Sequence, residues 1–250
     1  MSKVTLAKES TGLRVLTLND PSKRNKIDDA MRAELLESIT AVRHDPDATA
    51  LVVTGAGTAF CAGADLPAVF GDSRRSVATL REDLYKVYES FLPLRSLSIP
   101  TIAAVQGPAV GAGLNLAMVC DIRVAGPLAT FAATFSQIGL HPGGGCSWFL
   151  VQAMGEQRAL KLLLGGGTVL GPDSVDAGLA VSVEEDPLAA AVQLARGYAA
   201  MDPQLAQDIK RTVRAAARDG FDAVLELEAW AQASSGTKPA IQEVVARFRK

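Results

Sequence analysis

The hydrophobic pattern of the first fifty residues changes its period once. Apolar and polar positions alternate over residues 4–6 and 13–18, which predicts two short strands joined by a turn at residues 10–12. After Asp28, a residue type that caps helix N-termini, apolar positions recur every three or four residues until Pro46. This spacing predicts an amphipathic helix whose buried side carries Met31, Leu35, Ile39 and Val42.

Strand-like and helical segments alternate in the middle of the chain. Mainly apolar, uncharged runs at residues 51–54 and 101–105 predict buried strands, and a further strand is expected at residues 121–124. Helices are predicted at residues 76–92 and, after a glycine-rich turn, at residues 112–118. Such an alternation is typical of an α/β fold.

The segment from residue 187 onward is helical in pattern almost throughout. Its breaks are expected near Asp202-Pro203, Asp219-Gly220 and Ser235-Gly236. No low-complexity linker or shift in charge separates this segment from the residues before it. We therefore expect one continuous domain, with an α/β core at residues 1–186 and a helical C-terminal extension at residues 187–250.

The composition excludes several classes of protein. Of the 250 residues, 48% are hydrophobic, which is too many for a disordered chain. The 25 Lys and Arg nearly balance the 27 Asp and Glu, so no basic field is present to attract nucleic acid. Only two histidines occur, and the three cysteines have no metal-ligand spacing, so no metal site is expected. The unpaired cysteine set and the lack of a signal-peptide core indicate a cytoplasmic protein.

An uncharged stretch at residues 96–120 has the length of a membrane span. Glycines and prolines interrupt it, however, and a lipid-facing helix broken so often would leave backbone groups without hydrogen-bond partners. The interrupting residues are Pro100, Gly107, Pro108, Gly111 and Gly113. We therefore expect this stretch to form the buried centre of the fold, and we expect no membrane partner.

Two common types of site are disfavoured. A Gly-x-Gly pair at Gly55 and Gly57 follows a predicted strand, as in a dinucleotide fingerprint, but Phe60 stands at the third glycine position. The missing glycine disfavours an NAD-binding oxidoreductase, the rival from a different class, and no P-loop sequence is present. Cys146 and Ser147 follow a run of glycines without the Gly-x-Ser-x-Gly elbow of a hydrolase. A buried small residue explains Cys146 better than a nucleophile does.

Two turns rich in glycine and alanine remain, at residues 60–66 and 106–118, and together they resemble the crotonase (enoyl-CoA hydratase/isomerase) superfamily. Phe60-Cys-Ala-Gly-Ala-Asp-Leu66 is similar to one family block, and Gln106-Gly-Pro-Ala-Val-Gly-Ala-Gly-Leu-Asn115 to another. Further similar blocks lie in order at residues 18–25, 131–145 and 176–181. The resemblance implies a spiral of β-β-α turns whose C-terminal helices support a homotrimer or a dimer of trimers.

The resemblance also implies an acyl-CoA substrate. Family members hold the thioester oxygen with two backbone N–H groups, which by motif position belong to Ala64 and Ala112. Preorganised N–H donors of this kind stabilise the negative charge that develops on the oxygen. No cofactor besides the coenzyme A thioester, itself the substrate, is implied. The residues that would border the coenzyme A moiety are Arg24, Ala62, Asp65 and Leu66.

The two acid/base positions of the family's hydratases have changed. Their glutamates correspond to Asn115 and to Phe135, which has Thr134 beside it. Asparagine cannot exchange a proton, so hydratase turnover is in doubt. One hypothesis is an enzyme of altered chemistry, in which Asn115 orients water or substrate and His141 transfers protons. The alternatives are a weak hydratase, an isomerase or hydrolase with a different base, and an acyl-CoA binding protein without turnover.

A new base could also come from the helix at residues 76–92. Glu82 and Asp83 lie on that helix, in a region that often borders the acyl pocket in the family. Their spacing is equally that of the solvent face of an amphipathic helix, which we consider the simpler interpretation.

Overall fold

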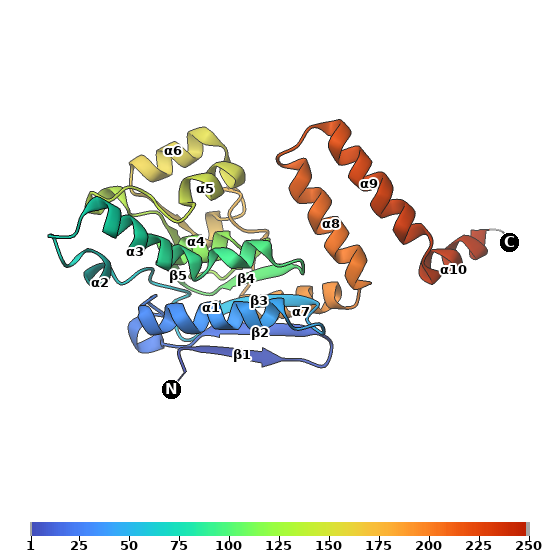
Figure 1. The fold of residues 1–250 in the computed structure, drawn as a ribbon, viewed down its shortest axis with the longest axis horizontal. Helices are drawn as coiled ribbons and strands as arrows, with labels where there is room; N and C mark the ends of the chain where they lie inside the picture. Colours follow the sequence, from blue (N-terminus) through green and yellow to red (C-terminus); the bar gives the residue numbers. More distant parts are fainter. Residues whose placement is uncertain (1, 249–250) are drawn as a thin grey trace.

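The computed structural model describes residues 2–248, and a six-stranded sheet forms its centre (Figure 1). The strand order is β1-β2-β3-β4-β6-β9, with β1 antiparallel to β2 and every later pair parallel. The strands are β1 (Val4–Lys8), β2 (Leu13–Leu18), β3 (Ala50–Gly55), β4 (Thr101–Val105), β6 (Ile122–Ala125) and β9 (Ser182–Val183). The α/β fold and the strands predicted from the apolar runs are confirmed.

A smaller sheet lies beside the first, and none of its three strands was predicted; the first of them lies within the expected glycine-rich turn. Its order is β5-β7-β8, with β5 parallel to β7 and β7 antiparallel to β8. The three strands are β5 (Pro108–Val110), β7 (Thr130–Ala132) and β8 (Thr168–Leu170). Each has three residues, too few for a period of two to show in the sequence.

The helices follow the predicted pattern, with three additions. Those predicted are α1 (Asp29–Arg43), α3 (Val77–Glu89), α4 (Ala112–Met118), α7 (Pro187–Ala199), α8 (Pro203–Ala216), α9 (Phe221–Gly236) and α10 (Pro239–Phe248). Those not predicted are α2 (Leu66–Phe70), α5 (Cys146–Met154) and α6 (Glu156–Leu164). Asp28 caps α1 as expected, its side chain accepting a hydrogen bond from the Met31 N–H at 3.0 Å.

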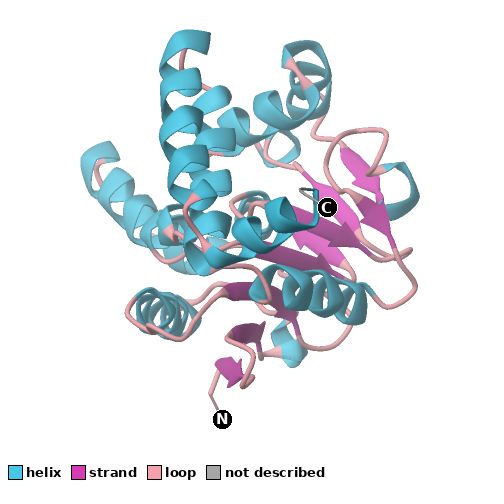
Figure 2. Ribbon diagram, turned by 90° about the vertical axis from the view of Figure 1, so that its right-hand side faces the viewer, coloured by secondary structure: helices cyan, strands magenta, loops and turns pink. Residues whose placement is uncertain are grey.

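Both faces of the large sheet are covered at its centre, which explains why β3 and β4 are mainly apolar and buried along almost their whole length, whereas most of the edge strand β1 is not buried. Leu51 and Val53 point to the side covered by α1, α3, α4 and α5, whereas Val52 and Ile102 point to the other side. On that second side α7 packs against β2, β3, β4 and β6. Figure 2 shows the central strands lying between helices.

The helices α8, α9 and α10 extend away from the large sheet (Figure 1). One carboxylate connects α8 to the core: Asp121 accepts from Lys210 and from Arg214, each at 2.6 Å, and from the backbone of Thr101 at 2.8 Å. Burial lowers the pKa of Lys210, and the carboxylate of Asp121 opposes that shift. Among the described residues, no helix is long and apolar enough to cross a membrane.

Candidate active site

On one side, the backbone around Ala64 is hydrogen-bonded to Ile27. Ile27 donates its N–H to the Gly63 carbonyl at 2.8 Å and accepts from the Asp65 N–H at 3.2 Å, which forms a parallel bridge opposite Ala64. In such a bridge the flanking residues face the partner chain, whereas the N–H and C=O of the central residue face away from it. The Ala64 N–H is therefore directed to the other side of this segment.

That other side is occupied by the turn between β5 and α4. Cys61 donates to the Pro108 carbonyl at 3.0 Å and accepts from Val110 at 3.0 Å, which places residues 61–64 beside this turn. Gly63 has a φ of 91°, and a Cβ on it would lie 2.5 Å from the Val110 oxygen and 3.4 Å from the Ala112 nitrogen. Only glycine fits at this close approach, which brings the backbones at Ala64 and Ala112 together.

The pocket at this junction has a volume of about 120 Å³. It is lined by all four residues predicted as catalytic, and also by Ala62 and Leu66 of the predicted coenzyme A set. The four are Ala64, Ala112, Asn115 and His141. The rest of its wall is mostly apolar and includes Phe70, Leu84, Val87, Val110, Phe135, Ile138 and Leu140. The fold thus brings together residues that lie far apart in the sequence.

Asn115 lies on α4 and is 1% exposed. Its Nδ2 atom donates to the Gly143 carbonyl at 2.7 Å. Because a carbonyl can only accept, this contact identifies the nitrogen, and the other side-chain atom must be Oδ1. That buried oxygen has no hydrogen-bond partner among the described residues. An acceptor in this state is suited to a donor supplied by a ligand.

His141 lies at the mouth of the pocket and is exposed. Its Nδ1 atom is 2.8 Å from the Pro142 carbonyl oxygen. Since that oxygen accepts, Nδ1 carries the proton and Nε2 is left with the lone pair of the neutral ring. The imidazole can accept a proton through Nε2, as the hypothesis for His141 requires.

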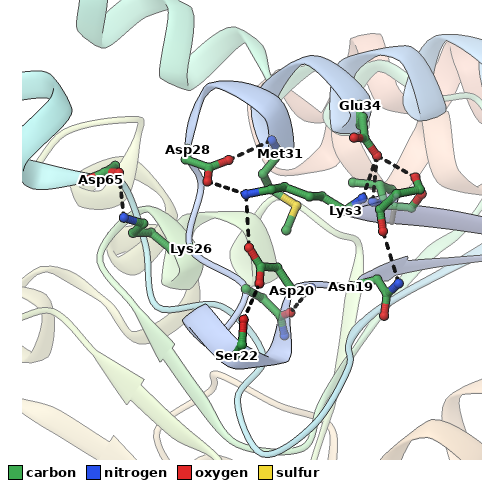
Figure 3. Close-up of polar contacts among 12 residues, drawn as sticks. Lys3, Asn19, Asp20, Ser22, Lys26, Asp28, Met31, Glu34 and Asp65 are labelled. Carbon is green, nitrogen blue, oxygen red and sulfur yellow. Dashed lines mark hydrogen bonds and ion pairs between the residues drawn. The ribbon is translucent and has the colours of Figure 1, made fainter.

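Two residues of the predicted coenzyme A set, Arg24 and Asp65, are not in the described pocket lining. Arg24 is exposed at a φ of 53°, and its carbonyl accepts from the Ala62 N–H at 2.9 Å. Asp65 pairs with Lys26 at 2.6 Å, at the left of Figure 3. The Arg24 carbonyl thus holds the segment that forms one wall of the pocket, and the Asp65 carboxylate is paired with Lys26 beside it.

No aspartate or glutamate belongs to the described lining of the pocket. Phe135 packs its ring near Gly111, where a Cβ would lie 3.7 Å from two of its carbons. Glu82 is exposed, and Asp83 pairs with Arg75 at 3.0 Å and with Lys86 at 2.7 Å. The surface interpretation of Glu82 and Asp83 therefore agrees with their positions.

Tyr88, on α3, lines the pocket, and the sequence analysis did not identify it. Its position in the helical pattern is that of an ordinary partly buried residue, so no signal in the sequence marks it. With His141 it is one of two titratable side chains in the described lining. A proton transferred within this pocket thus has few possible donors or acceptors.

The cysteines take no part in this chemistry. All three are buried, and desolvation raises the pKa of the Cys61, Cys120 and Cys146 thiols to about 12. They are therefore protonated and unreactive at neutral pH. Within residues 2–248, no group of three or more His, Cys, Asp or Glu side chains could hold a metal ion.

A larger cavity, of about 520 Å³, lies between α8 and the core. It contains none of the predicted site residues. Of its charged groups, Asp121 pairs with Lys210 and Arg214, whereas Arg123 and Arg218 donate to backbone carbonyls and Arg95 lies over the Trp148 ring. Apolar side chains such as Trp148, Phe149 and Met201 form much of its wall. This composition fits packing against another apolar surface better than it fits catalysis.

Comparison with known proteins agrees with this geometry. The family model for enoyl-CoA hydratase/isomerase matches residues 8–250. EchA14 of Mycobacterium tuberculosis, described as a probable enoyl-CoA hydratase, is 48% identical over 206 residues, covering 82% of this chain and 79% of its own. The 1,2-epoxyphenylacetyl-CoA isomerase of Escherichia coli is 34% identical and covers 99% of this chain and 96% of its own.

A solved structure confirms the fold. The crystal structure of an enoyl-CoA hydratase from Polaromonas sp. JS666 superposes with a TM-score of 0.88 at 29% identity, covering 98% of this chain and 96% of that one. The resemblance to the crotonase superfamily and the expected crotonase fold are thus both confirmed. The chain belongs to the enoyl-CoA hydratase/isomerase family.

Proposed function

We propose that this protein binds an acyl-CoA thioester and stabilises its enolate oxygen with the backbone N–H groups of Ala64 and Ala112. The observation that carries the proposal is the close approach at Gly63, which sets these two backbones side by side at the pocket. Neither N–H has a hydrogen-bond acceptor within the described part of the chain. Both donors are therefore available to a ligand oxygen.

Backbone donors suit this task because the fold fixes them. They need no reorganisation when charge develops on the thioester oxygen, and in a pocket of mainly apolar wall each contributes about 3 to 4 kcal/mol at the transition state. Methyl side chains at both positions leave room for the thioester. We further propose that Arg24, Ala62, Asp65 and Leu66 border the coenzyme A moiety, with the thioester as substrate and no other cofactor.

The reaction is an altered form of enoyl-CoA chemistry. The pocket offers no carboxylate pair, so Asn115 orients the substrate or a water and His141 moves the proton through Nε2. The names of two relatives, a probable enoyl-CoA hydratase and a 1,2-epoxyphenylacetyl-CoA isomerase, each specify a CoA thioester, which is the substrate class that the two backbone donors suit. The second candidate, favoured by the missing carboxylates, is acyl-CoA binding without turnover.

Replacement of Ala112 by proline tests the oxyanion assignment, because it deletes the donor N–H. Ala112 is the first residue of α4, a position where proline is well tolerated, so the variant should fold. We expect Ala112→Pro to lower turnover of crotonyl-CoA or 3-enoyl-CoA by about 100- to 1000-fold. Ala112→Gly keeps the N–H and is the matched control.

The readouts are product mass and absorbance, with calorimetry for acyl-CoA affinity. If a folded Ala112→Pro protein kept the affinity and rate of the parent, Ala112 would not hold the thioester oxygen. If the parent bound acyl-CoA but converted neither substrate, the result would support the second candidate function, acyl-CoA binding without turnover.

We also propose that the protein resides in the cytoplasm, where buried free thiols such as those of its cysteines stay reduced.

A further inference from the structure

The turn at Gly143 and Gly144 is built around the side chain of Tyr88. A Cβ on Gly143 would lie 2.2 Å from the Tyr88 hydroxyl oxygen, and one on Gly144 would lie 3.1 Å from its ring. A side chain at either position would therefore displace the tyrosine. These glycines belong to a run for which the sequence alone gave no function, and their contact with α3 supplies a reason for it.

Asn115 contacts the same turn from helix α4. Its Nδ2 atom donates to Gly143, and a Cβ on Gly144 would lie 2.7 Å from that nitrogen. Tyr88 and Asn115 thus flank the same two glycines, and both line the acyl pocket. One presents a hydroxyl, and the other presents a buried acceptor, Oδ1, that has no partner among residues 2–248.

The phenol of Tyr88 acts as a donor at neutral pH. Desolvation raises its pKa above the ordinary value, opposed by the Gly144 backbone N–H directed at the phenol oxygen. The phenol donates to no acceptor among the described residues, so its proton is available to a ligand. A protonated phenol and an unpartnered amide oxygen on residues that line the same pocket supply one donor and one acceptor.

We propose that Tyr88 and Asn115 together bind an O–H group in the acyl pocket, Tyr88 donating a hydrogen bond to its oxygen and Asn115 Oδ1 accepting a hydrogen bond from it. A hydroxyl is the simplest group that both accepts and donates, so it satisfies the two side chains at once. Its source is either a hydroxyl on the acyl chain, as in a 3-hydroxyacyl-CoA, or a water that reacts with an enoyl-CoA. This inference rests on the proposed acyl-CoA function and adds the recognition of the acyl group.

The test compares the parent with Tyr88→Phe, which removes the hydroxyl and keeps the ring. The matched control is Tyr85→Phe on the same helix. Tyr85 lies next to Tyr88, with 5.8 Å between ring centroids, but it is 48% exposed and is not in the described lining. Calorimetry gives the affinities for butyryl-CoA and for both configurations of 3-hydroxybutyryl-CoA, and absorbance gives the rate of crotonyl-CoA hydration.

If the O–H group is on the acyl chain, the parent binds one 3-hydroxybutyryl-CoA about tenfold more tightly than butyryl-CoA. Tyr88→Phe then loses this preference without losing affinity for butyryl-CoA, and Tyr85→Phe retains it. If the O–H group is water, the parent binds both ligands equally. Tyr88→Phe then lowers kcat for hydration about 100-fold at unchanged KM.

Two results would overturn the inference. In one, Tyr88→Phe equals the parent in ligand preference and in hydration rate. In the other, it weakens butyryl-CoA binding as strongly as 3-hydroxybutyryl-CoA binding, which marks a purely structural role. A parent protein that binds no CoA thioester would refute the proposed function and this inference with it. A parent that binds butyryl-CoA and is unaffected by Tyr88→Phe would refute this inference alone.

Discussion

Asn25 shows how one side chain shapes the pocket without touching a ligand. Its Nδ2 atom donates to the carbonyls of Ala56, Ala59 and Phe60 at 2.9, 2.8 and 3.2 Å, and its Oδ1 accepts from the Asp20 N–H at 2.9 Å. The residue is fully buried at a φ of 55°, a region that asparagine tolerates better than most residues. It thereby fixes the loop that leads into residues 61–64.

Asn25→Ala is expected to lower the free energy of unfolding by about 2 to 4 kcal/mol, because it leaves buried carbonyl groups without their donor. Urea unfolding followed by circular dichroism measures the change. Asn19→Ala is the control, since Asn19 donates a single hydrogen bond, to Ser2, on the exposed surface. Equal losses in the two variants would contradict the role assigned to Asn25.

The residues of the site differ in how far the sequence could identify them. Ala64 and Ala112 have featureless side chains and could be placed only by motif, because their backbone groups are what the site uses. Asn115 and Phe135 were recognisable as departures from that motif. Tyr88 could not be found, since its contact with Gly143 joins helix α3 to a turn more than fifty residues later. Only the folded chain makes that neighbourhood visible.

At the scale of the elements, an ion pair joins the start of β2 to the turn after α1. Arg14 is 4% exposed and donates through Nε to Asp45 at 3.0 Å, and Lys8 reaches the same carboxylate at 3.0 Å. These partners, Arg14 first, hold the pKa of Asp45 far below its ordinary value. A carboxyl group of lowered pKa stabilises the fold above its unfolded pKa, near 4, and loses that effect as the pH falls further.

Asp45→Asn is therefore expected to be less stable than the parent at pH 7, and the difference should shrink as the pH falls below about 4. Urea unfolding at pH 7, 5 and 3 measures it. Asp47→Asn serves as the control, because Asp47 forms no ion pair with the described residues. A stability difference that stayed constant from pH 7 to pH 3 would exclude the Asp45 carboxylate as its source.

Long elements were predictable because their burial imposes a period on many residues. The strand at Thr101–Val105 and the helix that begins after Asp28 are of this kind. The strand β5, by contrast, has three residues and begins with a proline, and its pairing with β7 depends on contacts that no local pattern encodes. The short helix α2 starts at the end of the turn predicted at residues 60–66, and α5 starts directly after the glycine run that ends at Gly145.

At the scale of the whole molecule, the C-terminal helices carry apolar surface without a cover. Phe221 and Trp230 on α9 are 77% and 70% exposed, and Phe248 on α10 is 86% exposed. Figure 1 shows these helices extending from the sheet. Large exposed apolar residues concentrated in one segment are typical of a protein interface.

We predict that the protein self-associates through this segment, as a homotrimer or a dimer of trimers. Light scattering should give three or six times the mass of one chain for the parent. Trp230→Asp combined with Phe221→Asp should give the mass of one chain, because charges replace the apolar contacts. Leu128→Asp is the control, because Leu128 is as exposed as these residues but belongs to the α/β part of the chain and not to the C-terminal helices. This variant should leave the mass unchanged. A monomeric parent would contradict the prediction.

The position of α7 has a consequence for synthesis on the ribosome. The sheet face formed by Leu13, Val52 and Ile102 is covered by Ala191 and Ala195, which emerge long after the strands do. At about 5 to 20 residues per second, a nascent chain carries this apolar face uncovered for roughly 5 to 20 s. The first strands made thus depend on one of the last segments translated, and chaperones have that interval in which to protect them.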